Sequence, residues 1–235
     1  MADSPFGVIF DLDGTLVASE ILYFRATERI LAPHGRSLAE LTPLERSLIP
    51  GRAAIENVRF YCRRFGLPDA PEEVSRRRME MVCRLLEEDG VVLIPGADAF
   101  VRALRAAGAR MAVASSSPRR YVERVLAITG LAPHFDAVRT GDDVTRYKPD
   151  PEIFELARRA LDLPAARCVV VEDAHSGIQA GKAASMRVLA VESEQTLPHQ
   201  AAAADRVVPD FRGLGVADIA ALLEAPAPQG AVPSC

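Results

Sequence analysis

Lysine is scarce in this chain: 26 of its 28 basic residues are arginine, and the two lysines are Lys148 and Lys182. Where almost every cation is an arginine, a remaining lysine marks a place where a compact ammonium suits better than a planar guanidinium. Lys182 lies on an apparent helix, so this bias does not identify a site by itself. Lys148 becomes a candidate only through the motif that surrounds it.

Other features are missing too, and each absence narrows the class of protein. The stretch MADSPFGVIFDLDG has neither the basic residues nor the long apolar run of a signal peptide, and no apolar run reaches the ~20 residues that span a bilayer. The four cysteines lie far apart without CxxC spacing, which favours reduced thiols over a disulfide framework. We therefore expect a cytoplasmic protein.

A surplus of charge of one sign is also missing. The formal net charge of −4 over 235 residues gives no field that would attract nucleic acid or an anionic membrane, so neither is expected as a partner. With 49% hydrophobic and 26% charged residues, the composition is that of a globular enzyme with one large domain or a domain carrying an insertion.

Short runs rich in valine and isoleucine recur along the chain and are separated, in its later part, by helical stretches. One helix is expected to begin after Ser117, with Pro118 at its first position. This alternation predicts an α/β fold, a doubly wound, Rossmann-like parallel sheet with helices on both faces. The expected strands are 7–10, 110–114, 136–139, 168–171, 187–191 and 206–208, and the expected helices are 118–129, 152–161 and 176–184.

The alternation is interrupted between residues 18 and 92, where every run is helical. The expected helices cover 20–32, 44–48, 53–65 and 71–88, with prolines at the joints. This block is too long for a single crossover. We therefore expect a catalytic core formed by residues 1–17 and 93–223, an inserted all-helical cap over 18–92, and a disordered Pro- and Ala-rich tail over 224–235.

The stretch VIFDLDGTL places two carboxylates, Asp11 and Asp13, directly after a strand that is expected to be buried. Burying a carboxylate is costly unless it is paired, hydrogen-bonded or bound to a metal. Because the two residues are two apart on extended chain, their side chains are expected to point the same way. One can then act as a nucleophile while the other transfers protons.

Four more polar residues follow strands or lie in loops of the later part. Ser115 follows a strand in AVASSSPRR, Lys148 lies in the loop RYKPDPEIF, and Glu172 and Asp173 end a strand in VVVEDAHSGIQA. Ligands of open parallel sheets bind beyond the carboxyl ends of the strands. Carboxylates, a hydroxyl and an ammonium are therefore expected to converge there with the two aspartates.

This set of groups suits phosphoryl transfer. Asp11 and Asp173 supply oxygen ligands of the kind that Mg²⁺ prefers next to a phosphate, and for Glu172 a metal contact and a structural role are both open. The cation would let the acids lie together. Ser115 can donate to a phosphate oxygen, and Lys148 can supply positive charge. The helix start after the serines offers further backbone amides to an anion.

In order and approximate spacing, DLDGT, Ser115, KPDP and EDAHSGIQA resemble the four motifs of the haloacid dehalogenase (HAD) superfamily. The helical insertion resembles the alpha-helical cap of a group that includes β-phosphoglucomutase, phosphoglycolate phosphatase and sugar-phosphate phosphatases. Four motifs in register, with the insertion in the matching gap, make the resemblance specific. It covers residues 5–223, nearly the whole chain.

The resemblance implies a Mg²⁺-dependent phosphatase acting on a small phosphomonoester, such as a sugar phosphate or a phosphoglycolate-like acid. It implies that Asp11 forms an aspartyl-phosphate. Asp13 would be the general acid and base, with its backbone carbonyl also touching the metal. Asp173 would be a further metal ligand.

The resemblance also assigns phosphate binding to Ser115 and Lys148, and we include the neighbouring Ser116. In the expected cap, the segment around Arg52 resembles the specificity loop of relatives, and Tyr23 is a second candidate for contact with the substrate. A cationic Arg52 would hold a second anionic group of the substrate, but an ordinary surface arginine explains this residue equally well.

Variation within the motifs narrows the reaction. Asp13 argues against a dehalogenase, which lacks this second aspartate, and against a phosphonoacetaldehyde hydrolase, which carries alanine there. A phosphomutase is the nearest alternative, but Tyr23 stands where β-phosphoglucomutase carries histidine. Product analysis distinguishes the two, since a mutase converts β-glucose 1-phosphate to glucose 6-phosphate and a phosphatase releases phosphate. A non-catalytic phosphate-binding protein is the alternative of another class, and the complete set of acids, serine and lysine argues against it.

Some polar residues have simpler interpretations. Ser117 is expected to be the N-cap of the helix that follows it. His175 is expected to bond the backbone rather than to transfer protons. The arginine pairs at 63–64, 119–120 and 158–159 are expected to be solvated helix faces.

Overall fold

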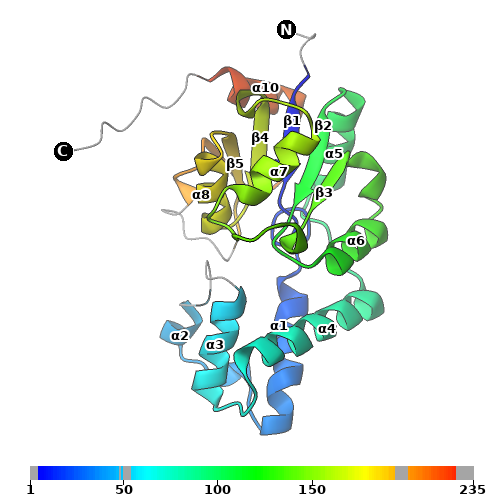
Figure 1. Ribbon diagram of the computed structural model, residues 1–235. Coiled ribbons are helices and arrows are strands. Elements are labelled where there is room, and N and C mark those ends of the chain that lie inside the picture. The colour runs from blue at the N-terminus through cyan, green and yellow to red at the C-terminus, as the bar shows by residue number, and fades with distance from the viewer. Residues whose placement is uncertain (1–4, 48, 50–53, 194–200, 226–235) are drawn as a thin grey trace, which may run out of the picture.

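A six-stranded sheet forms the centre of the molecule (Figure 1). The computed structural model describes residues 5–47, 49, 54–193 and 201–225. Neighbouring strands are parallel throughout and lie in the order β3-β2-β1-β4-β5-β6. The strands are β1 (Gly7–Phe10), β2 (Arg110–Ala114), β3 (Ala137–Arg139), β4 (Cys168–Glu172), β5 (Arg187–Val191) and β6 (Arg206–Val208).

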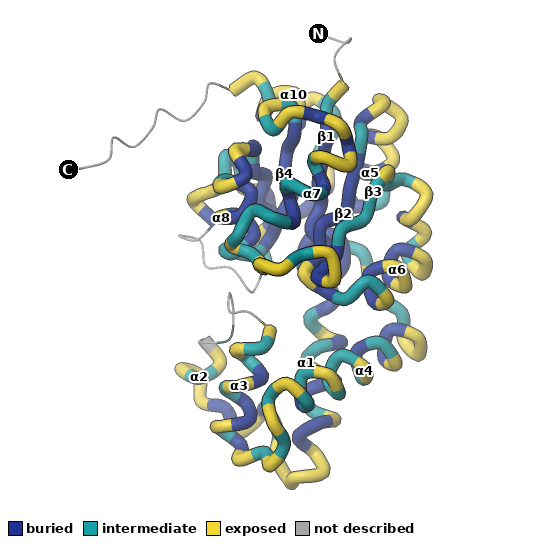
Figure 2. The backbone as a smooth tube through the Cα atoms, in the orientation of Figure 1, coloured by how far each residue is buried: buried dark blue, intermediate teal, exposed yellow. Residues whose placement is uncertain are grey.

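Helices cover both faces of this sheet, because successive strand residues point to opposite sides. Ile9 and Val170 belong to the apolar layer under α7 (Glu152–Ala160) and α8 (His175–Ala183). Phe10 belongs to the layer on the other face, together with α5 (Ala97–Ala106), α6 (Arg119–Ile128) and α10 (Val216–Glu224). The four central strands, β2, β1, β4 and β5, are almost continuously buried, whereas the edge strands β3 and β6 are partly exposed (Figure 2). The predicted doubly wound α/β fold is confirmed.

The strand order reverses at β1, which has β2 on one side and β4 on the other. In open α/β sheets, a crevice for ligands lies at such a reversal, beyond the carboxyl ends of the strands. The register of the strands determines which residues lie in this crevice. Phe10 pairs with Val113 of β2 and with Val171 of β4, so Asp11, the first residue after β1, lies level with Ala114 and Glu172.

The predicted boundaries agree with the observed ones to within one residue. The strands at 7–10, 110–114, 187–191 and 206–208 match, and β3 and β4 differ from their predictions by one residue at one end. One detail was wrong: α6 begins at Arg119, so Pro118 is its N-cap and not its first residue. Our interpretation of the sequence specified no helix at α5 or α10, and α10 extends one residue into the expected tail. Ala225 is the C-cap of this helix, and residues 226–235 of the tail lie outside the described residues.

Between β1 and α5, all regular secondary structure of the described residues is helical. This segment contains α1 (Glu20–Leu31), α2 (Pro43–Ser47), α3 (Ala54–Phe65) and α4 (Pro71–Asp89), which lie together below the sheet in Figure 1. Small apolar clusters of their own hold these helices together, one of them around Leu31, Tyr61 and Phe65. Short 3-10 turns complete the chain: Ala32–His34, Leu38–Glu40, Ala132–His134, Gly141–Asp143 and Ala165–Arg167.

Two chain segments connect this helical insertion to the sheet, and they lie side by side. Val17 forms an antiparallel bridge with Leu93. The amide of Ala18 donates to the carbonyl of Val92 at 2.9 Å, and the amide of Ile94 donates to Leu16 at 2.9 Å. The two chain connections between the insertion and the sheet therefore form one hydrogen-bonded pair, and Leu22 of α1 and Leu85 of α4 pack in the same apolar cluster as Phe10.

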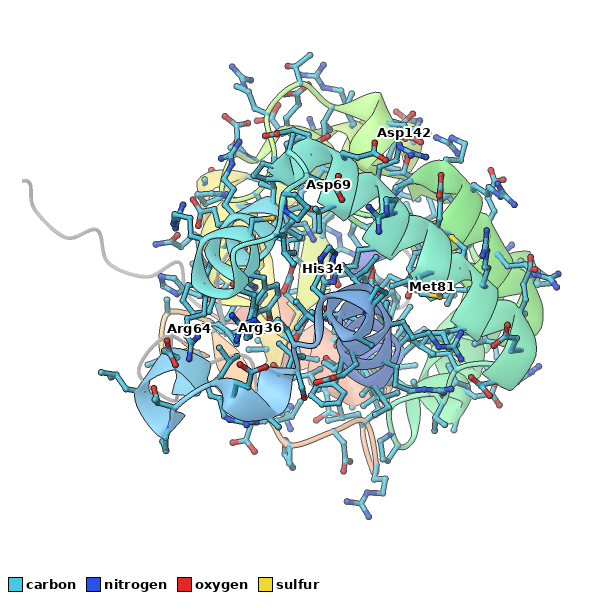
Figure 3. The ribbon with its side chains drawn as sticks, turned by 90° about the horizontal axis from the view of Figure 1, so that it is seen from below. His34, Arg36, Arg64, Asp69, Met81 and Asp142 are labelled. Carbon is cyan, nitrogen blue, oxygen red and sulfur yellow. The ribbon has the colours of Figure 1, made fainter. Side chains whose placement is uncertain are left out.

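Ion pairs cover the outer surface of the helical insertion, as seen from below in Figure 3. Arg36 pairs with Glu40 at 3.2 Å, and Asp69 accepts from Arg77 at 2.6 Å. Of the arginine pair at 63–64, Arg63 is exposed as expected of a solvated helix face, whereas Arg64 is partly buried and pairs with Glu45 of α2. Within the described parts of the chain, no helix is both long and apolar enough to cross a membrane.

Candidate active site

The side chain of Lys148 is the centre of the polar cluster at the carboxyl ends of the strands. Its Nζ donates to Asp11 Oδ1 at 2.5 Å, to Glu172 Oε1 at 2.8 Å and to the carbonyl of Ala114 at 3.0 Å. These three acceptors come from β2, β4 and the end of β1, at the level that the strand register sets. Nζ also lies 4.7 Å from the centre of the Phe154 ring. Lys148 thus satisfies all three of its donor directions inside the protein.

Burial makes the charges of this cluster depend on one another. The side chains of Lys148 and Glu172 are 6% and 1% exposed. Burial raises the pKa of the Asp11 carboxyl to about 7, while Lys148 lowers it and Glu172 raises it. Burial also lowers the pKa of Lys148, but the charges of Asp11 and Glu172 outweigh this effect and raise it above the ordinary lysine value. The lysine is therefore charged at every physiological pH.

Glu172 is held from two sides. Its Oε1 accepts from Lys148, and its Oε2 accepts from the amide of Ala174 at 2.6 Å. The space for this carboxylate is provided by Gly177 of α8, since a Cβ at that position would lie 1.6 Å from Oε1. Glu172 thus has clear structural bonds, which is one of the two roles left open from the sequence.

Asp173 follows on the same strand and meets the loop after β1. Its Oδ1 accepts from the hydroxyl of Thr15 at 2.9 Å. Gly14 has a positive φ of 85°, and a Cβ there would lie 2.3 Å from Asp173 Oδ2, so only glycine fits. Burial, and then the charges of Glu172 and Asp11, raise the pKa of Asp173 well above its ordinary value.

Asp13 binds different groups from Asp11. Its Oδ1 accepts from the Tyr121 hydroxyl at 2.7 Å, and its Oδ2 accepts from the Ser117 hydroxyl at 2.7 Å. The prediction that Ser117 caps α6 was wrong, because its hydroxyl is used here and Pro118 is the cap. The two aspartates lie close enough for the charge of Asp13 to raise the pKa of Asp11, but each has its own partners.

The serine loop after β2 lies next to these groups. Ser115 is buried, with 1% of its surface exposed, and its Oγ accepts from the amide of Ser117 at 3.1 Å. Ser116 is exposed. Its backbone lies tightly against Gly141, where a Cβ would come within 2.4 Å of the Ser116 carbonyl oxygen. The loop therefore has a fixed shape and carries an exposed hydroxyl.

Of the two candidates in the helical insertion, Tyr23 reaches this region and Arg52 lies outside the described residues. The Tyr23 hydroxyl lies 3.3 Å from Ser117 Oγ, and the Arg78 guanidinium lies 5.0 Å from the centre of the Tyr23 ring. Burial, and then the charge of Asp13, raise the pKa of Tyr23 above the ordinary tyrosine value. Tyr23 therefore contacts the Asp13 partner Ser117 across the boundary between insertion and sheet.

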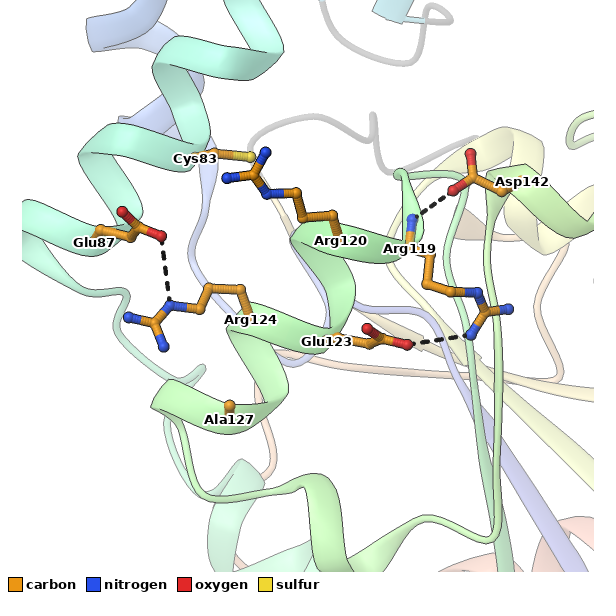
Figure 4. Close-up of a pocket in the computed structure, with 8 residues that line it drawn as sticks. All are labelled: Cys83, Glu87, Arg119, Arg120, Glu123, Arg124, Ala127 and Asp142. Atoms are coloured by element: carbon orange, nitrogen blue, oxygen red, sulfur yellow. Dashed lines mark hydrogen bonds and ion pairs between the residues drawn. The ribbon is translucent and has the colours of Figure 1, made fainter.

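A groove with a volume of about 620 Å³ separates α4 from α6, but it contains none of these carboxylates (Figure 4). Two of its three arginines are engaged: Arg119 binds Asp143 at 2.6 Å, and Arg124 lies 3.8 Å from Glu87. The groove is a seam between the insertion and the helices on the sheet. Its lining residues are Cys83, Glu87, Arg119, Arg120, Glu123, Arg124, Ala127 and Asp142.

Three residues of the site were missed by sequence reasoning. Thr15 stood within the quoted DLDGT motif without a role, and Gly177 stood within EDAHSGIQA. Tyr121 is the most informative, because it lies on the buried stripe of α6 among valine and leucine. A buried tyrosine hydroxyl needs a hydrogen-bond partner, so a tyrosine on an apolar stripe close to a polar site was the available signal.

Comparison with known proteins identifies the family. The family described as haloacid dehalogenase-like hydrolase matches residues 7–185, and this chain belongs to it. Hexitol phosphatase A of Escherichia coli is 33% identical over 192 residues, 82% of this chain and 85% of that protein. Protein CbbY of Cereibacter sphaeroides is 31% identical over 214 residues, 88% of this chain and 93% of that protein.

A solved structure is similar to this chain over nearly its whole length. The crystal structure of CbbY from Rhodobacter sphaeroides in complex with phosphate matches with a TM-score of 0.79 and 29% identity, covering 92% of this chain and 100% of that one. The resemblance stated from the motifs is confirmed. The chain is a hydrolase whose relatives include named phosphatases.

Replacing Gly177 by alanine tests the packing of Glu172. In an ordinary helix interior this change stabilises by roughly 0.5–1 kcal/mol. Here the added Cβ would displace the Glu172 carboxylate from Lys148 and Ala174, so we expect a loss of about 1–3 kcal/mol in the free energy of unfolding. Urea unfolding measures the change.

Gly215→Ala is the matched control, because no atom lies within 4 Å of a Cβ at that position. A Gly177→Ala protein as stable as the Gly215→Ala protein would contradict this packing.

Proposed function

We propose that this protein is a Mg²⁺-dependent phosphatase that hydrolyses a small phosphomonoester through an aspartyl-phosphate on Asp11. The observation that carries the proposal is the buried ammonium of Lys148, 2.5 Å from Asp11 and 2.8 Å from Glu172, with Asp13 two residues further along. A fixed positive charge beside a nucleophilic carboxylate also stabilises the charge of a transferring phosphoryl group. The substrate class, a sugar phosphate or a phosphoglycolate-like acid, is supported by the relatives named hexitol phosphatase and phosphorylated carbohydrates phosphatase.

The first half of the proposed reaction forms the phosphoenzyme. Lys148 holds Oδ1 of Asp11, so Oδ2 is the oxygen left to attack phosphorus. The new Oδ2–P bond forms as the P–O bond to the leaving alcohol breaks, and Asp13 gives its proton to that alcohol. Ser115 and Ser116 bind the phosphoryl oxygens, and Lys148 binds them in exchange for one of its three acceptors in the protein.

The second half regenerates the enzyme. Asp13, now a carboxylate, takes a proton from a water molecule, and the water oxygen attacks phosphorus. The bond between phosphorus and Asp11 breaks, inorganic phosphate leaves, and Asp13 is again protonated for the next turnover.

The carboxylates fit a hard divalent cation. Asp11, Asp173 and the backbone carbonyl of Asp13 would hold it, with Glu172 as a further candidate, since Mg²⁺ prefers oxygen ligands and keeps several waters. Burial and mutual repulsion keep the pKa of Asp11 and of Asp173 high, which is the electrostatic imbalance that a cation relieves. When bound, Mg²⁺ would neutralise phosphate charge beside the nucleophile.

The fit requires adjustment of side chains. Among the described residues, no three acidic, histidine or cysteine side chains already form a complete ligand set. Asp173 Oδ1 accepts from Thr15, and Asp11 Oδ1 accepts from Lys148. A bound metal ion would share these oxygens with their present hydrogen-bond donors.

The helices between β1 and β2 have a role in this proposal as a cap, with residues 18–92 as the cap and 1–17 and 93–223 as the core. The side-by-side chain connections at Val17 and Leu93 support it, because a cap whose two connections lie at one place can turn about that place. Closure of such a cap would exclude bulk water from the phosphoenzyme. Tyr23 and Arg52 are the proposed cap contacts to the substrate.

Asp11→Asn tests the nucleophile. We expect hydrolysis of p-nitrophenyl phosphate with Mg²⁺ to fall by roughly 10³-fold or more, because an amide cannot form the phosphoenzyme. Phosphate release is the measurement, with circular dichroism as the check on folding. Asp162→Asn is the control: its side chain is 99% exposed and its φ of 52° suits asparagine. Activity retained by the Asp11 variant would remove this mechanism.

Magnesium should stabilise the protein more at pH 8 than at pH 5. The pKa of Asp11 is raised from 3.8 to about 7 on folding, so the folded state loses stability as pH rises through this window and Asp11 becomes charged. Mg²⁺ competes with the proton at this carboxyl. We expect saturating Mg²⁺ to raise the Tm by on the order of 5 °C at pH 8 and by much less at pH 5, relative to EDTA.

The Asp11→Asn protein is the control for this measurement, because its amide does not titrate. Its Tm shift with Mg²⁺ should be small at both pH values. An equal shift at pH 5 and pH 8 in the unmodified protein would show that Asp11 does not hold the metal.

A further inference from the structure

The buried tyrosine of α6 is directly bonded to the proposed acid and base. Tyr121 has no exposed surface, and its hydroxyl donates to Asp13 Oδ1 at 2.7 Å. We propose that Tyr121 is a positioning residue for Asp13: it holds Oδ1 through the whole cycle, so that Oδ2 alone turns to the substrate. This inference rests on the proposed function, in which Asp13 transfers the proton.

Packing alone does not explain a tyrosine at this position. The neighbours of Tyr121 on the buried side of α6 are Val122, Val125 and Leu126, and its ring meets the Tyr23 ring edge-on at 6.2 Å. A phenylalanine would fill this space without bringing a hydroxyl into the core. A buried hydroxyl costs free energy unless it is bonded, and the 2.7 Å hydrogen bond to Asp13 Oδ1 meets this requirement.

The two hydrogen bonds of Asp13 differ in how easily they can be exchanged. Tyr121 is fully buried on a helix inside the main apolar layer, so its hydroxyl cannot move far. Ser117 has a short side chain whose hydroxyl also lies 3.3 Å from Tyr23, so it has a second partner when it leaves Asp13. The substrate therefore replaces Ser117 at Oδ2, while Tyr121 fixes the plane of the carboxylate.

Tyr121→Phe in the full chain tests this inference with two substrates. Phenyl phosphate has a basic leaving group that needs the proton of Asp13, whereas p-nitrophenyl phosphate has a leaving group that departs with little help. We expect kcat/KM, which reports formation of the phosphoenzyme, to fall by about tenfold or more for phenyl phosphate. For p-nitrophenyl phosphate the fall should be several-fold smaller.

Tyr61→Phe is the matched control. Tyr61 is also a buried tyrosine in apolar surroundings, but it lies in the helical insertion and packs against Leu31 and Phe65. Its loss of a hydroxyl should leave the ratio of the two kcat/KM values unchanged. The Tm of both variants shows that they are folded, and phenylalanine keeps the shape of the ring.

The outcomes are separable. Equal losses on both substrates for Tyr121→Phe, or no loss on either, would overturn the positioning role. If the unmodified protein hydrolyses neither aryl phosphate with Mg²⁺, the proposed function itself fails. Hydrolysis by the unmodified protein together with an unchanged ratio in Tyr121→Phe leaves the phosphatase standing and removes only this inference.

Discussion

The contact between one buried ammonium and two buried carboxylates is the interaction on which the rest of the site depends. Lys148 Nζ lies between Asp11 and Glu172, and without it two like charges would face each other in the protein interior. An unpaired buried charge costs several kcal/mol, so removal of the lysine would leave the acids protonated or displaced. A compact ammonium with three donors also reaches the Ala114 carbonyl, which a planar guanidinium would not match in this space. This explains why a lysine stands here in a chain whose other basic residues are, apart from Lys182, all arginine.

The parallel sheet supplies the geometry for this contact. Because Phe10 pairs with Val113 and with Val171, the residues that follow on three adjacent strands end at one level. The amide of Asp11 still donates to Val171, so the backbone is fixed up to the residue that carries the chemistry. Glycines 14 and 177 then provide space for Asp173 and Glu172, which larger residues would occupy. The acids are therefore held by backbone that is rigid on both sides.

Much of this arrangement could be predicted from the sequence, because it depends on local patterns. Short runs rich in valine and isoleucine located the strands to within a residue, and the rule for strand ends predicted that Asp11, Lys148 and Glu172 converge at one edge of the sheet. Ser117 and Tyr121 could not be assigned in the same way. Their roles depend on how α6 is oriented against the loop after β1. The hydrogen bonds from Ser117 and Tyr121 to Asp13 join residues about a hundred positions apart in the sequence. The direction of Asp13 was also beyond the strand rule, since the chain leaves the strand at Phe10.

The most direct measurement of the central claim is to find which residue carries phosphate during turnover. The enzyme is mixed with Mg²⁺ and a phosphomonoester, quenched in acid within milliseconds, digested, and mapped by mass spectrometry. A phosphate adduct on the peptide that contains Asp11, placed on that side chain by fragmentation, is the expected result. Phosphate released in the first turnover with no adduct on Asp11, or an adduct on another residue, would contradict the arrangement of nucleophile and ammonium described above.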